Sequence, residues 1–301
     1  MERVAYEAGV DQASEGVIYS EMRLAPQLLA SSTTALLPPS QTTPTTMACA
    51  RDVVDAALEG LRRAECETGA KLRLILTCVR GMPEWAPQVL DLCREYSGRG
   101  VVGIDVCGVG PAGAGGACAS QRVEYGEEVT DPVIVETFQA AAVQFQRAAS
   151  CGVHRTAHAG EAGPAASVTR AVRDLRAERI GHGYRAVMEG AYEQALSAGV
   201  HFECCPTSSF LTGAVPRTVK EHPVVTLRRA GASFSLSTDN PAVTHTTLED
   251  EYRLALRLGL THDDILQSNR SAISACFLPD DEKWELQRKF ERLTSAATTS
   301  S

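Results

Sequence analysis

A histidine and a glutamate stand three positions apart where an apolar run of the chain ends. The run "CGVHRTAH" (151–158) is typical of a buried strand, and "AGEAGP" after it is typical of a turn. His158 closes the run, and Glu161 lies on the turn. A neutral imidazole can ligate zinc and a carboxyl group can deliver a proton, so the pair is a candidate half of an active site.

Polar residues also end two other apolar runs. His182 ends "ERIGH", and Asp239 and Asn240 end "FSLSTDN". A second histidine can hold or deprotonate a water, and zinc brings the pKa of a bound water down to roughly 7. These residue types therefore predict metal-assisted hydrolysis. The other histidines begin strands or fall in loop and helix contexts, and we interpret them as structural or surface residues: His154, His201, His222, His245 and His262.

Apolar runs typical of strands alternate with helical patterns along the chain. This alternation indicates a parallel sheet with crossover helices. Its regularity favours the α/β class and a (β/α)8 TIM-type barrel with seven of eight strands recognisable and extra C-terminal helices. In such a barrel, catalytic residues lie at the carboxyl ends of several strands, which is where the residues above fall. The predicted strands cover 16–23, 71–79, 100–108, 151–158, 178–183, 199–206 and 232–239; the predicted helices cover 51–68, 84–97, 132–150, 165–177, 189–198, 219–230, 246–258, 262–275 and 280–293.

The domain organisation follows from this pattern. We expect one barrel domain over residues 1–294, N-terminally incomplete because the chain begins inside a helical pattern, and a disordered tail over 295–301. Two segments have loop composition: 31–50 is rich in Ser, Thr and Pro, and 109–131 opens with Gly and Ala. Both follow strands, so we expect them on the catalytic face of the barrel.

Composition excludes several classes of partner. The net charge of −8 is spread along the chain without clustered Lys or Arg, which argues against a nucleic-acid or anionic-membrane surface. No apolar run approaches the roughly 18 residues of a membrane span. The ten cysteines form no C-x-x-C pair, and the N-terminus does not resemble a signal peptide, so we expect reduced thiols and a cytoplasmic protein.

Several motifs together resemble one known family. "HRTAHAGEAG", "ERIGHGYRA", "HFECCPTSSFLTGA" and "FSLSTDNP" are similar to motifs of the adenosine deaminase family of zinc hydrolases. "VIYSEMRLAPQLL", "VVGIDVCG" and "FLPDDEK" match further motifs of that family, in order and over nearly the whole chain. "HRTAHAGE" and "CPTSSFLTGA" resemble the adenosine branch more than the AMP or adenine branches.

The resemblance implies an activity and a set of roles. The expected reaction is hydrolytic deamination of adenosine and 2′-deoxyadenosine to inosine and deoxyinosine with release of ammonia, with one Zn²⁺ per chain and a purine nucleoside as the small-molecule partner. His158 and Asp239 are then zinc ligands. Glu161 donates a proton to the ring nitrogen beside C6, and His182 orients or deprotonates the attacking water. Asp239 also helps to position that water.

The sequence departs from the family pattern at three places. The family has an H-x-H zinc-ligand pair at the end of its first strand, and no H-x-H occurs in this sequence. His158 and Asp239 alone supply two ligands where catalytic zinc usually has three, so we expect weak zinc binding and impaired turnover. Asn240 replaces an aspartate expected to contact purine N7. The backbone N–H of Gly108 is expected at another purine nitrogen, but "VGPAGAGG" replaces the acidic residues that usually follow it.

Two alternatives to an adenosine deaminase are open at this stage. A catalytically inactive paralogue would keep the barrel as a nucleoside-binding or interaction module, and the absent H-x-H favours it. Retention of Glu161 and His182 beside Asp239 favours the enzyme. The second alternative is a deaminase of AMP or N6-modified purine nucleotides, which should carry Lys or Arg near the catalytic loops. We find no clear cluster of that kind.

Overall fold

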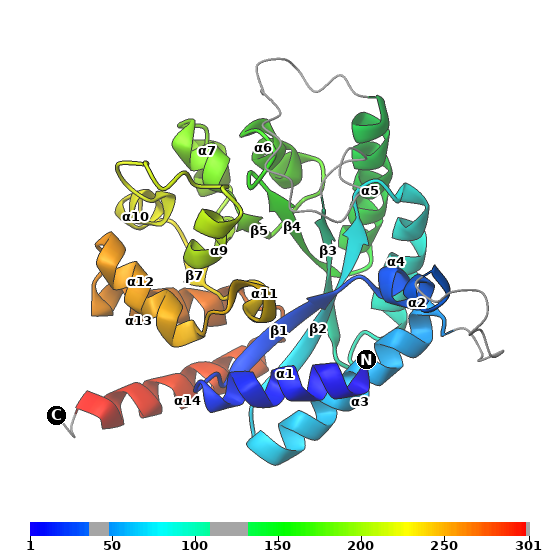
Figure 1. The fold of residues 1–301 in the computed structure, drawn as a ribbon, viewed down its shortest axis with the longest axis horizontal. Coiled ribbons are helices and arrows are strands. Elements are labelled where there is room, and N and C mark those ends of the chain that lie inside the picture. Colours follow the sequence, from blue (N-terminus) through cyan, green and yellow to red (C-terminus); the bar gives the residue numbers. More distant parts are fainter. Residues whose placement is uncertain (36–47, 109–131, 299–301) are drawn as a thin grey trace.

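The computed structural model describes residues 1–35, 48–108 and 132–298. Seven parallel strands form one sheet in which each strand pairs with the next along the chain (Figure 1). All seven predicted strands are confirmed, with small shifts at their ends. The strands are β1 (Tyr19–Leu24), β2 (Lys71–Val79), β3 (Val101–Cys107), β4 (His154–Ala159), β5 (Arg179–His182), β6 (His201–Cys204) and β7 (Phe234–Leu236).

Charged side chains inside the sheet show that it curls into a partial barrel. Arg179 of β5 lies 2.6 Å from Glu21 of β1 and 2.9 Å from Glu203 of β6. Arg23 of β1 pairs with the same Glu203. Since β1 and β6 stand five positions apart in the strand order, their side chains meet only if the sheet bends and these residues point to its concave side. The predicted barrel class is therefore confirmed, with seven strands among the described residues.

Helices connect successive strands and cover the outside of the sheet (Figure 1). Local sequence explains several of their starts: α12 and α13 each begin with a capping box, in which Thr247 and Thr261 accept from the backbone N–H three residues on. The helices are α1 (Glu2–Ser14), α2 (Pro26–Ala35), α3 (Ala50–Thr68), α4 (Ala86–Glu95), α5 (Pro132–Ser150), α6 (Ala166–Arg173), α7 (Tyr184–Met188), α8 (Glu193–Ser197), α9 (Pro206–Leu211), α10 (Pro223–Arg229), α11 (Pro241–Thr244), α12 (Leu248–Leu258), α13 (His262–Ala275) and α14 (Asp280–Thr298).

Two boundary predictions need correction. The predicted loop 31–50 begins inside a helix, because α2 continues to Ala35, and Ala50 already belongs to α3. The tail predicted as disordered from 295 is helical as far as Thr298, since α14 continues past the last amphipathic turn that the sequence pattern picks out. The remainder of the first loop (36–47), the whole of the loop 109–131 and residues 299–301 lie outside the described residues.

Besides α2, whose second half fell in the predicted loop 31–50, sequence reading missed three short helices that follow strands. α7 begins directly after β5, while α9 and α11 follow β6 and β7 and start at Pro206 and Pro241. Proline suits the first turn of a helix, because the N–H it lacks would have no intrahelical partner there. Helices of four to six residues bury too little to show an apolar period, so their sequences resembled loops. No helix in the described part of the chain is both long and apolar enough to cross a bilayer.

Candidate active site

The predicted site residues gather at the carboxyl ends of β4, β5 and β7. His158 is the last residue but one of β4, and Glu161 lies on the turn that follows. His182 is the last residue of β5, and Asp239 follows β7 by three residues. Parallel strands bring these ends to one face, so the structure places together residues that are up to 81 positions apart in the sequence.

Two of these residues have unusual backbone conformations. His182 has φ of 68° and Asp239 has φ of 61°, both in the left-handed region that non-glycine residues rarely adopt. Such conformations cost on the order of 1–3 kcal/mol and persist where the surrounding structure enforces them, often at functional sites. His182 is the last residue of β5 and Asp239 lies between β7 and α11, so both conformations occur where the chain leaves the sheet.

A buried carboxylate on the neighbouring strand β3 contacts the ring of His158. Asp105, in the middle of β3, has no exposed surface, and its Oδ2 lies 3.0 Å from His158 Nδ1. Burial alone would raise the pKa of Asp105, but the charges of His158 and Arg23 outweigh it and keep that pKa below its usual range. In turn the carboxylate outweighs burial and raises the pKa of His158. Sequence analysis missed Asp105, although a lone acid inside "VVGIDVCG" was a signal.

His182 lies between His158 and Glu161. Its ring centroid is 5.3 Å from that of His158, and its Nε2 is 3.4 Å from Glu161 Oε2. The residue is 3% exposed, and burial lowers the pKa of the ring, which favours the neutral imidazole. Among the described residues, its Nδ1 is buried without a hydrogen-bond partner. Orphaned buried nitrogens are rare in native proteins, so this atom calls for an explanation.

Asp239 is oriented by two neighbouring donors. Ser208, on the short helix α9 after β6, donates its hydroxyl to Asp239 Oδ2 at 2.7 Å. Asn240 donates its side-chain amide to Asp239 Oδ1 at 3.2 Å. Carboxylates that ligate metals are commonly held by hydrogen bonds of this kind. Ser208 was another functional candidate that sequence reading missed, although it lies in the quoted motif "CPTSSFLTGA".

A group of possible metal ligands is present at these strand ends. One ligand atom each from His182, Cys205 and Asp239 lies within 4.8 Å of the other two. Catalytic zinc takes three protein ligands of nitrogen, oxygen or sulfur type and leaves a fourth position open, so the donor set fits zinc. The group includes the predicted ligand Asp239 but not the predicted ligand His158.

Arg80 forms a hydrogen bond with Gly108, the residue predicted to contact the purine. The Arg80 guanidinium, at the end of β2, donates to the Gly108 carbonyl at 3.0 Å and also to the His158 carbonyl. Gly108 has φ of 90°, a conformation that favours glycine, and an added Cβ would have its nearest neighbours at 3.8 Å. The backbone conformation, and not lack of space, therefore explains glycine here.

The histidines interpreted as structural have structural contacts. His154 bonds Glu178 at 2.7 Å and stacks on Phe277. His201 contacts the hydroxyl of Ser233, just before β7, and the hydroxyl of Ser235, within β7. Burial lowers the pKa of His201 to about 3. His222 caps α10 by accepting from the backbone N–H of Val224. These contacts confirm the interpretation for these three.

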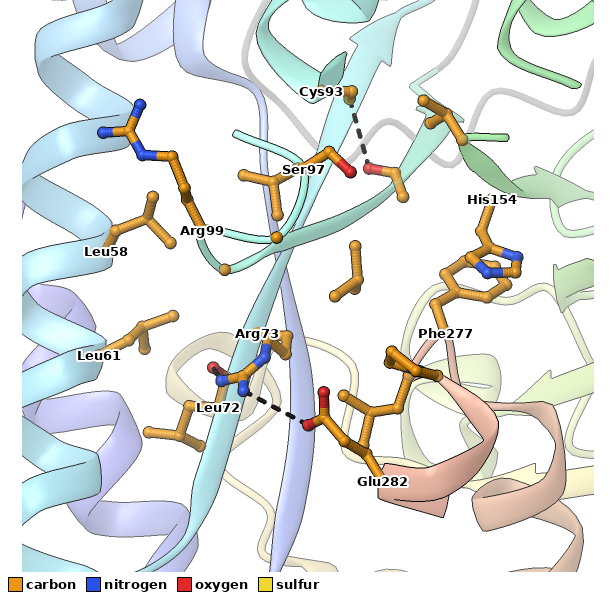
Figure 2. A pocket seen from close by; sticks show the side chains of 18 of the residues that line it. Leu58, Leu61, Leu72, Arg73, Cys93, Ser97, Arg99, His154, Phe277 and Glu282 are labelled. Atoms are coloured by element: carbon orange, nitrogen blue, oxygen red, sulfur yellow. Dashed lines mark hydrogen bonds and ion pairs between the residues drawn. The ribbon is translucent and has the colours of Figure 1, made fainter. Parts of the chain in front are cut away.

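A cleft of about 660 Å³ lies at the other end of the strands. It is lined by the first residues of β2, β3 and β4 and by α3, and Figure 2 shows His154 stacked on Phe277 at one side and Arg73 paired with Glu282 below. None of the predicted site residues is among the described residues that line it. The chemistry-bearing groups and this cleft therefore occupy opposite ends of the partial barrel.

Comparison with known proteins decides the family. The family model described as adenosine deaminase matches residues 1–292. The chain belongs to the adenosine deaminase family. It is 37% identical over 295 residues to adenosine deaminase of Xenopus laevis, covering 96% of this chain and 75% of that protein, and 37% identical over 299 residues to adenosine deaminase of Mus musculus, covering 97% and 77%. It is accordingly a member of a family of metal-dependent, hydrolytic deaminases.

Solved structures of related deaminases share the fold. The structure of Arabidopsis ADAL complexed with IMP aligns with a TM-score of 0.75 at 26% identity, covering 98% of this chain and 78% of that one. The Arabidopsis N6-mAMP deaminase MAPDA aligns with a TM-score of 0.74 at 25% identity, covering 97% and 79%. The proteins similar to this chain thus include adenosine deaminases and an N6-mAMP deaminase.

Proposed function

We propose that this protein hydrolyses the 6-amino group of adenosine and 2′-deoxyadenosine, giving inosine or deoxyinosine and ammonia. The observation that carries this proposal is the convergence of Glu161, His182 and Asp239 at the carboxyl ends of β4, β5 and β7, with His182 and Asp239 held in left-handed backbone conformations. A binding module has no need for a proton donor beside a neutral, buried imidazole. The convergence therefore supports an enzyme over an inactive paralogue.

The site residues divide the work of the reaction. Water adds at C6 of the purine and the amino group leaves as ammonia, so one group must accept a proton from water and another must protonate the ring. His182, kept neutral by burial, accepts the proton from the attacking water. Glu161, 3.4 Å away and partly exposed, protonates the ring nitrogen beside C6. Asn240 and the backbone N–H of Gly108 donate to the other purine nitrogens.

Zinc would be held by His158 and Asp239, as proposed from the family motifs. When bound, Zn²⁺ lowers the pKa of a coordinated water to roughly 7 and polarises it for attack. His158 is suited to this role because Asp105 accepts from its Nδ1, so that Nε2 is the ring nitrogen that would ligate the metal. Two ligands predict weak binding and impaired turnover, and zinc per chain measured by elemental analysis after mild chelation tests this.

Nucleotide substrates are the second candidate, favoured by the likeness to ADAL and MAPDA. A phosphate would need a cation with free donors at the catalytic end. Arg80 is at that end, but its guanidinium is engaged by the carbonyls of His158 and Gly108. We therefore rank the nucleoside above the nucleotide.

The test is a direct assay of product. Purified protein, both without added metal and over a range of Zn²⁺ concentrations, is incubated with adenosine, AMP and N6-methyl-AMP, and inosine and IMP are quantified by chromatography. Glu161→Gln should lower turnover of adenosine by about 10²–10⁴-fold, because it removes the proton donor. The exposed Glu193→Gln in α8 is the matched control. Turnover of AMP alone would replace the nucleoside by the nucleotide, and no turnover of any of the three would refute the proposal.

A further inference from the structure

The group formed by His182, Cys205 and Asp239 contains a thiol that the proposed mechanism does not use. The three residues come from the ends of three consecutive strands, β5, β6 and β7. Their ligand atoms lie within 4.8 Å of one another. In a tetrahedral zinc site with bonds of 2.0–2.3 Å, ligand atoms are about 3.3–3.8 Å apart. A contraction of about 1 Å would bring this group to ligating geometry.

Two further observations support a cation at this group. His182 is only 3% exposed, yet its Nδ1 has no hydrogen-bond partner among the described residues. Asp239 accepts from Ser208 and Asn240, and no arginine or lysine of the described residues forms an ion pair with its carboxylate. A cation bound here would contact both the unpartnered ring nitrogen and the oriented carboxylate.

The neighbouring cysteines differ in where they lie. Cys204 is the last residue of β6, is fully buried and belongs to the main hydrophobic core of the protein. Cys205 follows it, and successive side chains at a strand end point to opposite faces. Cys205 is outside that core cluster and lies beside His182 and Asp239. The pair therefore offers a natural comparison between a core thiol and a site thiol.

We propose that His182, Cys205 and Asp239 form a thiolate-containing site for a zinc-class cation. On binding, the Cys205 thiol releases its proton to solvent and the thiolate sulfur bonds the metal, so metal uptake releases a proton. A metal held in this way occupies His182 and Asp239, so it withdraws His182 from the attacking water and Asp239 from the catalytic zinc. Occupancy of the site is therefore inhibitory, a consequence that rests on the proposed deaminase function, whereas the binding itself does not.

The test uses cobalt as a spectroscopic substitute for zinc. Chelator-treated protein is titrated with Co²⁺ under reducing conditions, and the sulfur-to-cobalt charge-transfer band in the near ultraviolet is followed. The wild type should develop this band with about one Co²⁺ per chain, Cys204→Ala should keep it, and Cys205→Ala should lose it. Cys205→Ser, closer in shape, serves if circular dichroism shows that the alanine variant does not fold.

Activity separates this inference from the proposed function. Excess Zn²⁺ should inhibit adenosine turnover in the wild type more than in Cys205→Ala. Cobalt binding without a thiolate band, or with a band that survives in Cys205→Ala, overturns the inference even if adenosine is deaminated. A band that depends on Cys205 in a protein without deaminase activity supports the site and refutes the proposed function instead.

Discussion

Asp105 Oδ2 lies 3.0 Å from His158 Nδ1, directly beneath the strand end that carries the predicted zinc ligand. The two residues are 53 positions apart and come from the neighbouring strands β3 and β4. A carboxylate that accepts from one ring nitrogen fixes the tautomer of the histidine and makes the other nitrogen the better metal ligand. Metal affinity at this site should therefore depend on a residue that cannot itself reach the metal.

Asp105→Asn should lower zinc affinity by about 10–100-fold. The amide no longer carries the charge that raises the pKa of His158 and orients its ring. Competition with a chromophoric chelator, carried out in the Cys205→Ala background to remove the thiol ligand, measures the affinity, and Asp91→Asn on the exposed face of α4 is the control. Equal affinities of wild type and Asp105→Asn would mean that His158 is not a ligand.

Arg179→Met should destabilise the protein by about 3–5 kcal/mol. Arg179 is 6% exposed and lies 2.6 Å from Glu21 and 2.9 Å from Glu203, so its removal leaves two buried carboxylates short of a cation. Urea unfolding followed by circular dichroism measures the loss. Arg173→Met, at an exposed pair with Asp174, should change the free energy of unfolding by less than about 1 kcal/mol. Similar effects of the two substitutions would contradict the role of the buried network.

Gly183→Ala should destabilise more than Gly190→Ala. Both glycines have φ near 70°, so alanine costs roughly 1–2 kcal/mol of backbone strain at either position. At Gly183, however, a Cβ would lie 2.6 Å from Phe202 Cδ1, whereas at Gly190 it would meet nothing within 4 Å. Overpacking should add about 1–3 kcal/mol at Gly183 alone. Thermal unfolding of the two variants side by side tests the difference, and equal losses would be inconsistent with the close contact.

Stability should fall in mild acid because of His201. The unfolded chain binds a proton at the ordinary histidine pKa of 6.5, whereas burial lowers the pKa of folded His201 to about 3. Between these pH values the unfolded state holds the additional proton, so the free energy of unfolding decreases as pH drops, by about 3 kcal/mol at pH 4. His201→Gln should flatten this slope in urea titrations at pH 7 and pH 4. The same change at the exposed His262 is the control. If the free energy of unfolding of His201→Gln depends on pH as steeply as that of the wild type, other titratable groups cause the acid sensitivity.

Local patterns were enough to locate the strands and the residues at their ends. His158, His182 and Asp239 each close or follow an apolar run, and run length and composition depend on nearest neighbours along the chain. The short helices α7, α9 and α11 were missed for the same reason, since their residues are too few to show a period. The end of α14 was placed too early because its last five residues are Thr, Ser and Ala, which include no large apolar side chain that would show a helical period.

The sequence by itself determined the alternation of strands and helices, the family motifs and the candidate residues at three strand ends. Only the tertiary structure decided which side chains meet there: Asp105 beneath His158, Ser208 against Asp239, and Cys205 beside His182. The physical reason is that these contacts join different strands. They depend on strand register, on which face each side chain takes and on the curl of the sheet, and none of these is encoded in the spacing within a single segment.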